Sequence, residues 1–219
     1  EMTKELNNRI KATENFSTDL VHEIRNPLAS LKSASEIISD TTDKDKQEKL
    51  LKIMTHDVSR IDRLITDYSQ ILKDELAISS EQMDDLDLKP IIESVVDDFN
   101  NIYIEKKNIN IKLNTSGSKS YFIKGISNRI EQIIANLLDN AVSFSKEGSI
   151  VSVNLGKNEN WTTLKVSDEG EGFKESDIKK VFDRFYSNRP ENFGEHSGLG
   201  LNIVKNLVQI HKGQIYASN

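Results

Sequence analysis

Residues 50–72 read LLKIMTHDVSRIDRLITDYSQIL, and this stretch decides the first half of the fold. Its apolar side chains recur at alternating intervals of three and four residues, which places them on one face of a helix. The positions are Leu51, Met54, Val58, Ile61, Ile65, Tyr68 and Leu72. A heptad pattern sustained over three repeats is typical of helices that pack in a bundle.

A second amphipathic helix is predicted upstream. Residues 1–76 contain no glycine and a single proline, Pro27, which is the composition of long helices. The polar break Asp40–Asp43 then separates the two helices, so we expect an antiparallel hairpin. A hairpin alone buries too little apolar surface, and a dimeric four-helix bundle is the economical solution. A purely structural stalk is the alternative at this stage.

From Leu86 onward the pattern changes to short helices mixed with strands. Two strand-like runs flank the turn 157–160 and predict a hairpin. The expected elements are helices at 90–104, 128–142, near Lys180 and after Gly198, and strands at 109–113, 149–155, 161–167 and 214–217. We therefore predict helices on one face of a mixed sheet, an α/β sandwich that follows the α-helical domain. The expected domains are residues 1–80 and 81–219, with a hinge at 78–81.

Composition excludes several kinds of function. The formal net charge is −6 and the sequence pI is about 5.4, which argues against a nucleic-acid partner. The sequence has no cysteine, so disulfides, thiolate metal sites and thiol catalysis are excluded. No apolar run approaches the roughly 18 residues that span a bilayer. Because residue 1 is Glu, we expect a part of a longer protein whose membrane contact lies in segments absent here.

His22 is the first candidate catalytic residue. At 100° per residue it lies about 180° from the apolar stripe of its helix, and Asn26 shares its face. The adjacent Glu23 can hold an imidazole in the tautomer whose other nitrogen is a nucleophile. Pro27 costs a helix about 3 kcal/mol or kinks it beside the ring. An exposed histidine is more often an idle surface residue, and His56 also faces away from its seam.

Asn136 and Asn140 form the second candidate site. They lie four residues apart, so both amides project from one face of a helix. Amide oxygens are hard ligands that suit Mg²⁺ together with phosphate oxygens. Two polar residues on an exposed helix face would give the same pattern, so this motif alone is weak.

Two glycine-containing segments complete the set. The run Asp168-Glu-Gly170-Glu-Gly172 follows a strand, where a carboxylate could accept from an exocyclic amine while the glycines admit a planar ligand. The run Ser197-Gly198-Leu199-Gly200-Leu201 precedes an apolar helix, whose first N–H groups and dipole can cradle a phosphate. Each segment by itself is more often a turn or a loop.

Together, in this order, the four segments resemble the sensor histidine kinases of two-component systems. The run Phe16 to Leu28 fits the phosphoacceptor motif, and Phe182-Asp-Arg-Phe185 fits the box after the first glycine box. The resemblance covers the whole chain. It implies a dimerisation and phosphotransfer domain followed by the ATP-binding domain shared with gyrase and heat-shock chaperones.

The resemblance also implies roles for individual residues. His22 would take the γ-phosphoryl group of ATP, Glu23 would assist as base, and Asn26 would position water during dephosphorylation of the partner. Asn136 and Asn140 would hold Mg²⁺, Asp168 would recognise adenine, and residues 186–197 would form a lid. The remaining residues of the expected nucleotide site are Ser143, Phe144, Gly170, Gly172, Arg184, Ser197, Gly198, Leu199, Gly200 and Leu201.

The implied partners are a second copy of the chain and the receiver domain of a response regulator. The implied location is the cytoplasmic face of the bacterial inner membrane.

The sequence departs from the family pattern at three places. Ser143 stands where the family often has a lysine that reaches a phosphate, although Lys146, Arg184 or Arg189 could supply that charge. Glu195 and His196 stand where the second glycine box usually opens with further glycine, which implies weaker phosphate binding by the lid. The family fold continues into another strand beyond Asn219, so we expect a truncated sheet edge.

Two other functions fit parts of the sequence. A gyrase- or chaperone-type ATPase shares the nucleotide fold, but those proteins have a glutamate base where Asn136 stands. A non-enzymatic dimeric scaffold with a degenerate nucleotide site is the second alternative. The phosphoacceptor segment has no role in either, and we therefore predict a histidine kinase.

Overall fold

The computed structural model describes residues 2–77, 82–117, 120–173, 178–186 and 197–219, with side chains omitted at 2–16 and 73–77. The chain divides into two compact units, residues 1–73 with 195–197 and residues 74–194 with 198–219. The expected hinge at 78–81 lies outside the described residues.

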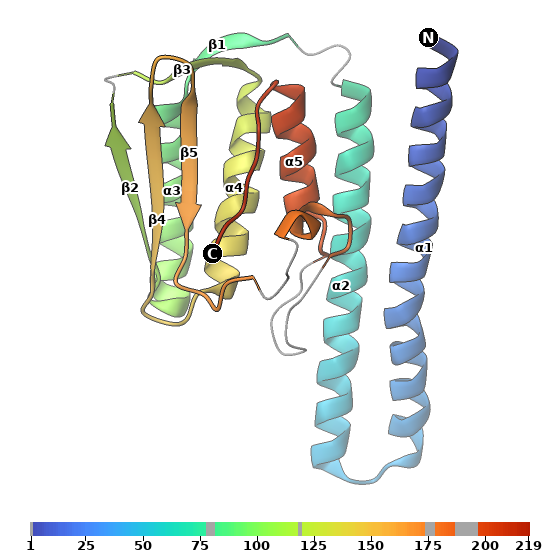
Figure 1. Cartoon of the computed structure of the whole chain (residues 1–219). Helices are drawn as coiled ribbons and strands as arrows, with labels where there is room; N and C mark the ends of the chain where they lie inside the picture. The colour runs from blue at the N-terminus through green and yellow to red at the C-terminus, as the bar shows by residue number, and fades with distance from the viewer. Residues whose placement is uncertain (1, 78–81, 118–119, 174–177, 187–196) are drawn as a thin grey trace. The chain divides into compact units, whose positions relative to one another are not determined.

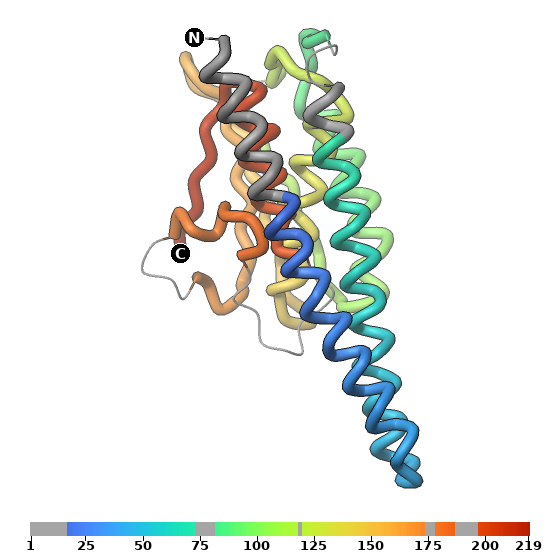
Figure 2. Tube along the Cα trace, turned by 90° about the vertical axis from the view of Figure 1, so that its right-hand side faces the viewer, coloured from blue at the N-terminus to red at the C-terminus, as the bar shows by residue number. Residues whose placement is uncertain are grey.

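The first unit is the predicted helical hairpin. Helix α1 spans Met2–Asp40 and α2 spans Lys44–Ala77, and Figures 1 and 2 show them side by side and antiparallel. Asp43 begins α2, because its Oδ1 accepts from the backbone N–H groups of Asp45 at 3.0 Å and Lys46 at 3.3 Å. Among the described helices, none is long and apolar enough to cross a membrane.

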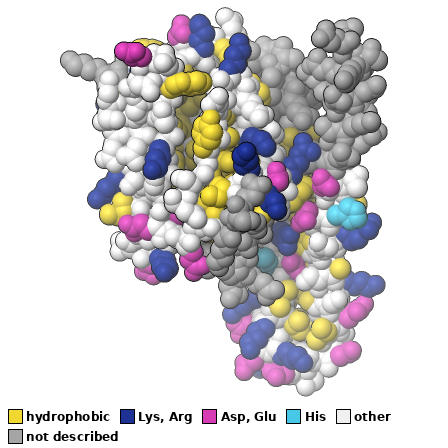
Figure 3. Space-filling model, viewed as in Figure 1, with side chains coloured by type: hydrophobic (Ala, Val, Ile, Leu, Met, Phe, Trp, Pro, Cys, Tyr) yellow, Lys and Arg dark blue, Asp and Glu magenta, His cyan; other side chains and the backbone are white. Residues whose placement is uncertain are grey.

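The two helices contact each other along one seam and leave another exposed. The buried seam repeats every seven residues on both helices. Its members are Leu20, Pro27 and Ala34 on α1, and Asp57, Leu64 and Ile71 on α2. The predicted seam lies beside it: Leu51, Val58 and Ile65 are 54%, 56% and 49% exposed in the single chain. The hairpin therefore keeps a heptad row of apolar side chains at its surface, and Figure 3 shows apolar side chains among charged ones in its lower part.

Two polar cross-links set the register of the hairpin. Arg60 Nη2 lies 3.0 Å from Glu23 Oε2, and Ser17 Oγ lies 3.2 Å from Tyr68 Oη. Because the two helices are antiparallel, a step from Arg60 toward the N-terminus of α2 matches a step from Glu23 toward the C-terminus of α1. Asp57, three residues before Arg60, therefore lies at the level of Pro27, four residues after Glu23. Asp57 is only 7% exposed, and its Oδ2 has no hydrogen-bond partner among the described residues.

The second unit contains two sheets and the remaining helices. Its elements are β1 (Asp84–Asp87), α3 (Leu88–Lys107), β2 (Asn110–Ser116), β3 (Phe122–Gly125), α4 (Ser127–Phe144), β4 (Ile150–Lys157), β5 (Thr162–Ser167), the 3-10 helix η1 (Ile178–Phe182) and α5 (Gly200–Ile210). The three-stranded sheet has the order β2-β4-β5, with β2 parallel and β5 antiparallel to β4. It is the mixed sheet that the sequence predicts.

Helices α3 and α4 pack against the sheet, and α5 packs on α4 (Figure 1). Alternation along β4 supplies the core from the sheet side, since Val151, Val153 and Leu155 are buried. The predicted turn joins β4 to β5, where Asn158 Oδ1 accepts from the N–H of Asn160 at 3.0 Å and of Trp161 at 2.8 Å.

The sequence did not predict the pairing of β1 with β3. Asp84 and Asp85 give β1 little strand propensity, yet it pairs antiparallel with Phe122–Gly125. Asp87 closes the junction, because its Oδ1 accepts from Lys89 N at 3.2 Å, which caps α3, and from Tyr121 N at 3.1 Å.

The strand expected at 214–217 is wrong. Residues 213–219 have no strand conformation, and no backbone hydrogen bond between the described residues joins 214–217 to β5. Side-chain bonds hold this tail instead: Phe173 N donates to Asn219 Oδ1 at 2.7 Å, and Asn219 Nδ2 donates to Phe173 O at 3.1 Å. An apolar alternation alone does not make a strand without a ladder partner.

Candidate functional site

The helical unit presents His22 to solvent. His22 and Asn26 are both exposed on α1, one turn apart, while Pro27 is buried. The helix runs through the proline without interruption. Because proline has no N–H, the carbonyl of Glu23 loses its intrahelical partner directly after the imidazole. The histidine side chain is therefore accessible on a helix whose hydrogen-bond ladder has a gap beside it.

Glu23 has a partner on α2. Its Oε2 accepts from Arg60 Nη2 at 3.0 Å, and the two side chains are 27% and 36% exposed. Neighbouring residues on a helix point about 100° apart, so a carboxylate turned toward α2 faces away from the imidazole. A role of Glu23 as base for His22 therefore requires exchange of Arg60 for the imidazole.

In the second unit, Asn136 and Asn140 are half-buried on one face of α4. The start of α5 lies beside them, since a Cβ placed on Gly200 would be 3.5 Å from Asn136 Oδ1. The amide oxygen of Asn136 and the N-terminus of α5 thus lie close together, and Asn140 follows one turn further along the same face of α4. This donor set fits a hard divalent cation that also binds phosphate oxygens, and it fits the phosphates themselves.

Ser143 lies one turn beyond Asn140 and is half-buried. Its Oγ donates to the backbone carbonyl of Asn140 at 2.7 Å. The hydroxyl hydrogen that could reach a phosphate is thus used within α4. The alternative cation Lys146 is exposed and Arg184 is half-buried, while Arg189 lies outside the described residues.

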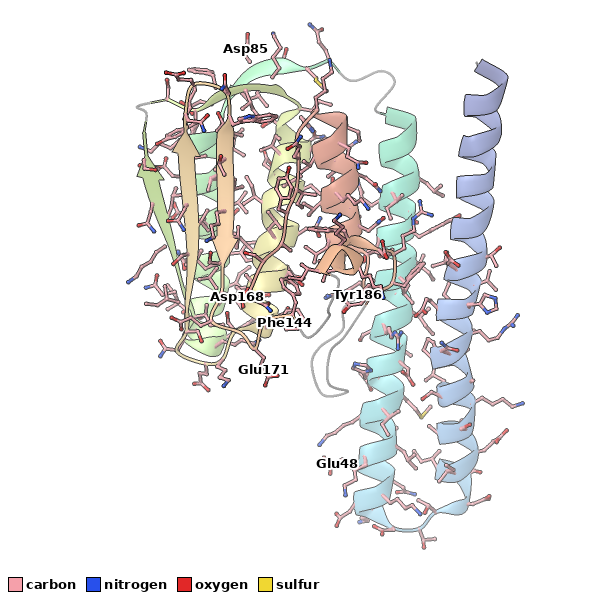
Figure 4. The ribbon with its side chains drawn as sticks, viewed as in Figure 1. Glu48, Asp85, Phe144, Asp168, Glu171 and Tyr186 are labelled. Atoms are coloured by element: carbon pink, nitrogen blue, oxygen red, sulfur yellow. The ribbon has the colours of Figure 1, made fainter. Side chains whose placement is uncertain are left out.

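Phe144, Asp168 and Gly170 meet where α4 and β5 end, and Figure 4 shows Phe144 and Asp168 close together. A Cβ on Gly170 would be 2.6 Å from Asp168 Oδ1 and 3.2 Å from Phe144 Cβ. Asp168 Oδ1 accepts from Gly170 N at 2.8 Å. Asp168 is exposed, because it follows the last residue of β5. A planar ring laid against Phe144 could therefore reach the exposed carboxylate of Asp168.

The second glycine segment begins α5. Gly198 has φ of +74°, and a Cβ there would lie 2.9 Å from the carbonyl carbon of Phe185 and 3.0 Å from Tyr186 O. Only glycine fits this conformation and this close approach. Leu199 is fully buried as the N-cap, and Gly200 and Leu201 form the first helical residues.

The remaining residues of the expected nucleotide site lie at the surface or close to it. Ser197 is half-buried and Gly172 is exposed with φ of +72°. Residues 187–196 of the expected lid lie outside the described residues.

Asn202 is a residue that the sequence analysis missed. It is 8% exposed, and its Nδ2 donates to Phe182 O at 2.9 Å. This bond ties η1 to the first turn of α5, beside the glycine segment. In the sequence it is only a polar residue in the first turn of an amphipathic helix, and its burial could not be read from that pattern.

Comparison with known proteins identifies both units. Residues 12–77 match the family described as His Kinase A (phospho-acceptor) domain. Residues 125–219 match the family described as Histidine kinase-, DNA gyrase B-, and HSP90-like ATPase. The first match contains His22, Glu23 and Asn26, and the second contains every residue of the expected nucleotide site.

Relatives align over the full chain. Sensor protein ChvG of Agrobacterium fabrum is 37% identical over 226 residues, and its counterpart in Rhizobium meliloti is 36% identical over 227. Both alignments cover 100% of this chain but only 38% and 39% of the relatives, so the chain spans less than two fifths of their length.

One solved structure shares the fold over most of the chain. It is histidine kinase ThkA in complex with response regulator protein TrrA, with a TM-score of 0.69 and 22% identity, covering 94% of this chain and 57% of that chain. A helical hairpin followed by an ATPase domain, in the order found here, is the arrangement that these comparisons share. The chain therefore belongs to the sensor histidine kinases and contains their phospho-acceptor domain and their ATPase domain.

Proposed function

We propose that this chain phosphorylates itself on His22 with the γ-phosphoryl group of ATP and passes that group to an aspartate of a response regulator. The observation that carries the proposal is the exposed imidazole on α1, within the phospho-acceptor match, in the same chain as the ATPase domain. The ThkA structure contains a response regulator, which supports the same class of partner here.

In the proposed reaction an imidazole nitrogen of His22 attacks the γ-phosphorus in line. The bond from that phosphorus to the bridging oxygen breaks, and ADP leaves with the electron pair. The ring proton passes to a base, for which Glu23 is our candidate once it exchanges Arg60. Asn136 and Asn140 would hold Mg²⁺, and the bound ion would supply positive charge that neutralises the phosphates. Asp168 and Phe144 hold the adenine, and the N-terminus of α5 orients the phosphates.

The exposed heptad row supports a homodimer. Leu51, Val58 and Ile65 recur every seven residues and are about half exposed in the single chain. A second hairpin placed against this row would bury it and complete a four-helix bundle. We also propose that Asn26, one turn from His22, orients water when the regulator is dephosphorylated. Because ATP and response regulators are found in the cytoplasm, we assign the chain to the cytoplasmic face of the membrane.

Incubation with γ-labelled ATP and Mg²⁺ tests the kinase. We expect a labelled protein whose phosphate is lost in acid and kept in alkali, as for a phosphoramidate, and transfer of the label to a receiver domain. Hydrolysis of ATP without a phosphoprotein would support the gyrase-type ATPase. Failure to bind ATP would support the scaffold.

A further inference from the structure

Both ring nitrogens of His211 are engaged, one by each of two helices. Nε2 lies 3.1 Å from the backbone N of Ile126, which precedes α4, and Nδ1 lies 2.7 Å from the carbonyl of Leu207 in α5. A carbonyl can only accept and an N–H can only donate. The ring is therefore the neutral tautomer with its hydrogen on Nδ1 and its lone pair on Nε2.

The start of α4 needs this acceptor. Ile126 is the N-cap of α4 and has no side chain that caps the helix. In a capping box the third helical residue would accept from the N-cap N–H, but here that residue is Arg129, a donor only. His211, 85 residues away, supplies the missing acceptor. Gly125 leaves room for the ring, because a Cβ there would be 3.1 Å from His211 Cδ2.

The end of α5 holds the ring in place. His211 is the C-cap of α5, and the chain beyond it is tied back to the helix. Lys212 N donates to Gln209 O at 2.9 Å, and Gly213 N donates to Val208 O at 2.9 Å. These hydrogen bonds keep the C-terminal end of α5 ordered, and they therefore fix the position of the His211 imidazole.

The same pair of helices forms the nucleotide site at its other end. From Ile126 to Asn136 is ten residues of α4, and from His211 back to Gly200 is eleven residues of α5, or about 15 Å along each helix. At that distance a Cβ on Gly200 would be 3.5 Å from Asn136 Oδ1. The two helices are thus connected at one end by His211 and meet at the other around the candidate ligands.

We propose that His211 is a positioning residue for nucleotide binding, a clasp that fixes the angle between α4 and α5. The proposal rests on the ATP-binding function proposed above. A rotation of about 5° at the clasp would move the far ends by about 1 Å over 15 Å of helix, which is enough to misalign the groups that contact the nucleotide before it binds. His211 itself touches neither the expected magnesium ligands nor the glycine segment.

Substitution by leucine and by glutamine separates the acceptor from the bulk of the ring. The side chain of His211→Leu fills space but leaves the Ile126 N–H unpaired, so we expect ADP with Mg²⁺ to bind about tenfold more weakly. The amide oxygen of His211→Gln can reach the position of Nε2, and we expect binding within about twofold of the natural chain. Gln209→Leu, an exposed change in the same turn, is the matched control and should bind normally.

Gly125→Ala tests the clasp with the histidine kept. Its methyl group would press on the ring, so we expect weakened ADP binding like that of His211→Leu. In autophosphorylation both variants should raise the KM for ATP and change kcat little, because bound nucleotide holds the helices at the correct angle. Wild-type binding by His211→Leu, or failure of His211→Gln to restore binding, would overturn the proposal even if both proteins melt earlier.

Nitrogen NMR of the imidazole gives a readout that needs no nucleotide. We expect Nδ1 to be protonated and Nε2 to be bare and hydrogen-bonded, and we expect slow exchange of the Ile126 amide that becomes fast in His211→Leu. A hydrogen on Nε2 in place of Nδ1 would overturn the proposal, because Nε2 could then not accept from the Ile126 N–H. If the natural chain bound no nucleotide, the proposed function would fail, while this spectrum would still decide the contact.

Discussion

Arg60 on α2 holds Glu23 on α1 by an ion pair of 3.0 Å, directly next to the exposed His22. The carboxylate that the sequence suggests as a base is thus bound to the other helix. The ion pair raises two possible roles for Glu23, a catalytic one and a structural one, which the sequence alone does not distinguish. Glu23 either acts on the imidazole after release from Arg60 or serves only to brace the hairpin.

Glu23→Gln and Arg60→Gln distinguish these roles. If Glu23 acts as a base, Glu23→Gln should slow autophosphorylation by roughly 100-fold or more, as loss of a general base does. Arg60→Gln leaves the carboxylate available and should keep the rate. Both should cost less than about 1 kcal/mol of stability, because the pair is partly exposed. Equal slowing by the two variants, measured with labelled ATP, would make the pair a brace.

His22→Gln should bind ATP as the natural chain does and form no phosphoprotein, because it removes the nucleophile and leaves the ATPase domain unchanged. His56→Gln is the matched control on α2, and it should be labelled normally. Acid-labile label retained by His22→Gln would move the acceptor to another residue.

Asn26→Ala should abolish dephosphorylation of the regulator and keep most autophosphorylation. The reason is its place on the exposed face one turn from His22, where an amide can orient water without touching ATP. Release of phosphate from a labelled receiver domain, compared with labelling of the kinase itself, measures the two steps. Equal loss of both would mean that Asn26 only supports the acceptor helix.

Val58→Glu with Ile65→Glu should dissociate the dimer. The two side chains belong to the exposed heptad row, and burying two carboxylates there without partners is costly. Thr66→Glu, an exposed change next to Ile65, should leave the dimer intact. Light scattering at micromolar concentration measures the outcome, and a natural chain that is already monomeric would refute the bundle.

Ser143→Lys should tighten ATP more than ADP, by around fivefold. The serine hydroxyl already donates to Asn140 O, so the natural chain has little to offer a phosphate from this position. A lysine would add a charged donor, and charge-assisted bonds are about twice as strong as neutral ones. Ser143→Ala should change neither affinity by much. Titration of ATP and ADP against both proteins measures the effect. An unchanged ratio of ATP affinity to ADP affinity would mean that another cation contacts the phosphates.

The sequence predicted the parts of the fold that depend on local pattern. The heptad repeat predicted α2, and the polar run at 157–160 predicted the hairpin between β4 and β5, because neighbours in the chain determine both. The strand pair β1 and β3 escaped prediction, since an acidic segment became a strand only through a partner almost forty residues away. The tail at 214–217 failed for the opposite reason, because it has strand-like residues but no strand paired with it among the described residues.

The candidate site divides in the same way. Motif spacing indicated Asn136, Asn140, Asp168 and the glycine segments, and their roles stay predictions. Two contacts made by residues far apart in the chain could not be predicted from the sequence. Arg60 reaches Glu23 across 37 residues and His211 reaches Ile126 across 85, so no local pattern reports either bond.

One layer of the buried seam between α1 and α2 contributes little to the packing of the two helices. Just beyond the phosphoacceptor, the seam contains the buried Pro27 on α1 and, at the same level on α2, the buried Asp57, whose Oδ2 has no partner among the described residues, whereas Leu64 and Ile71 occupy the next layers of α2. Burying a carboxyl oxygen without a hydrogen-bond partner costs free energy, because the oxygen loses its contacts with water. Thermal breathing of the two helices should therefore start at this layer. The imidazole of His22 stands about one turn from it, so a small opening there tilts the reactive ring while the layers beyond stay closed.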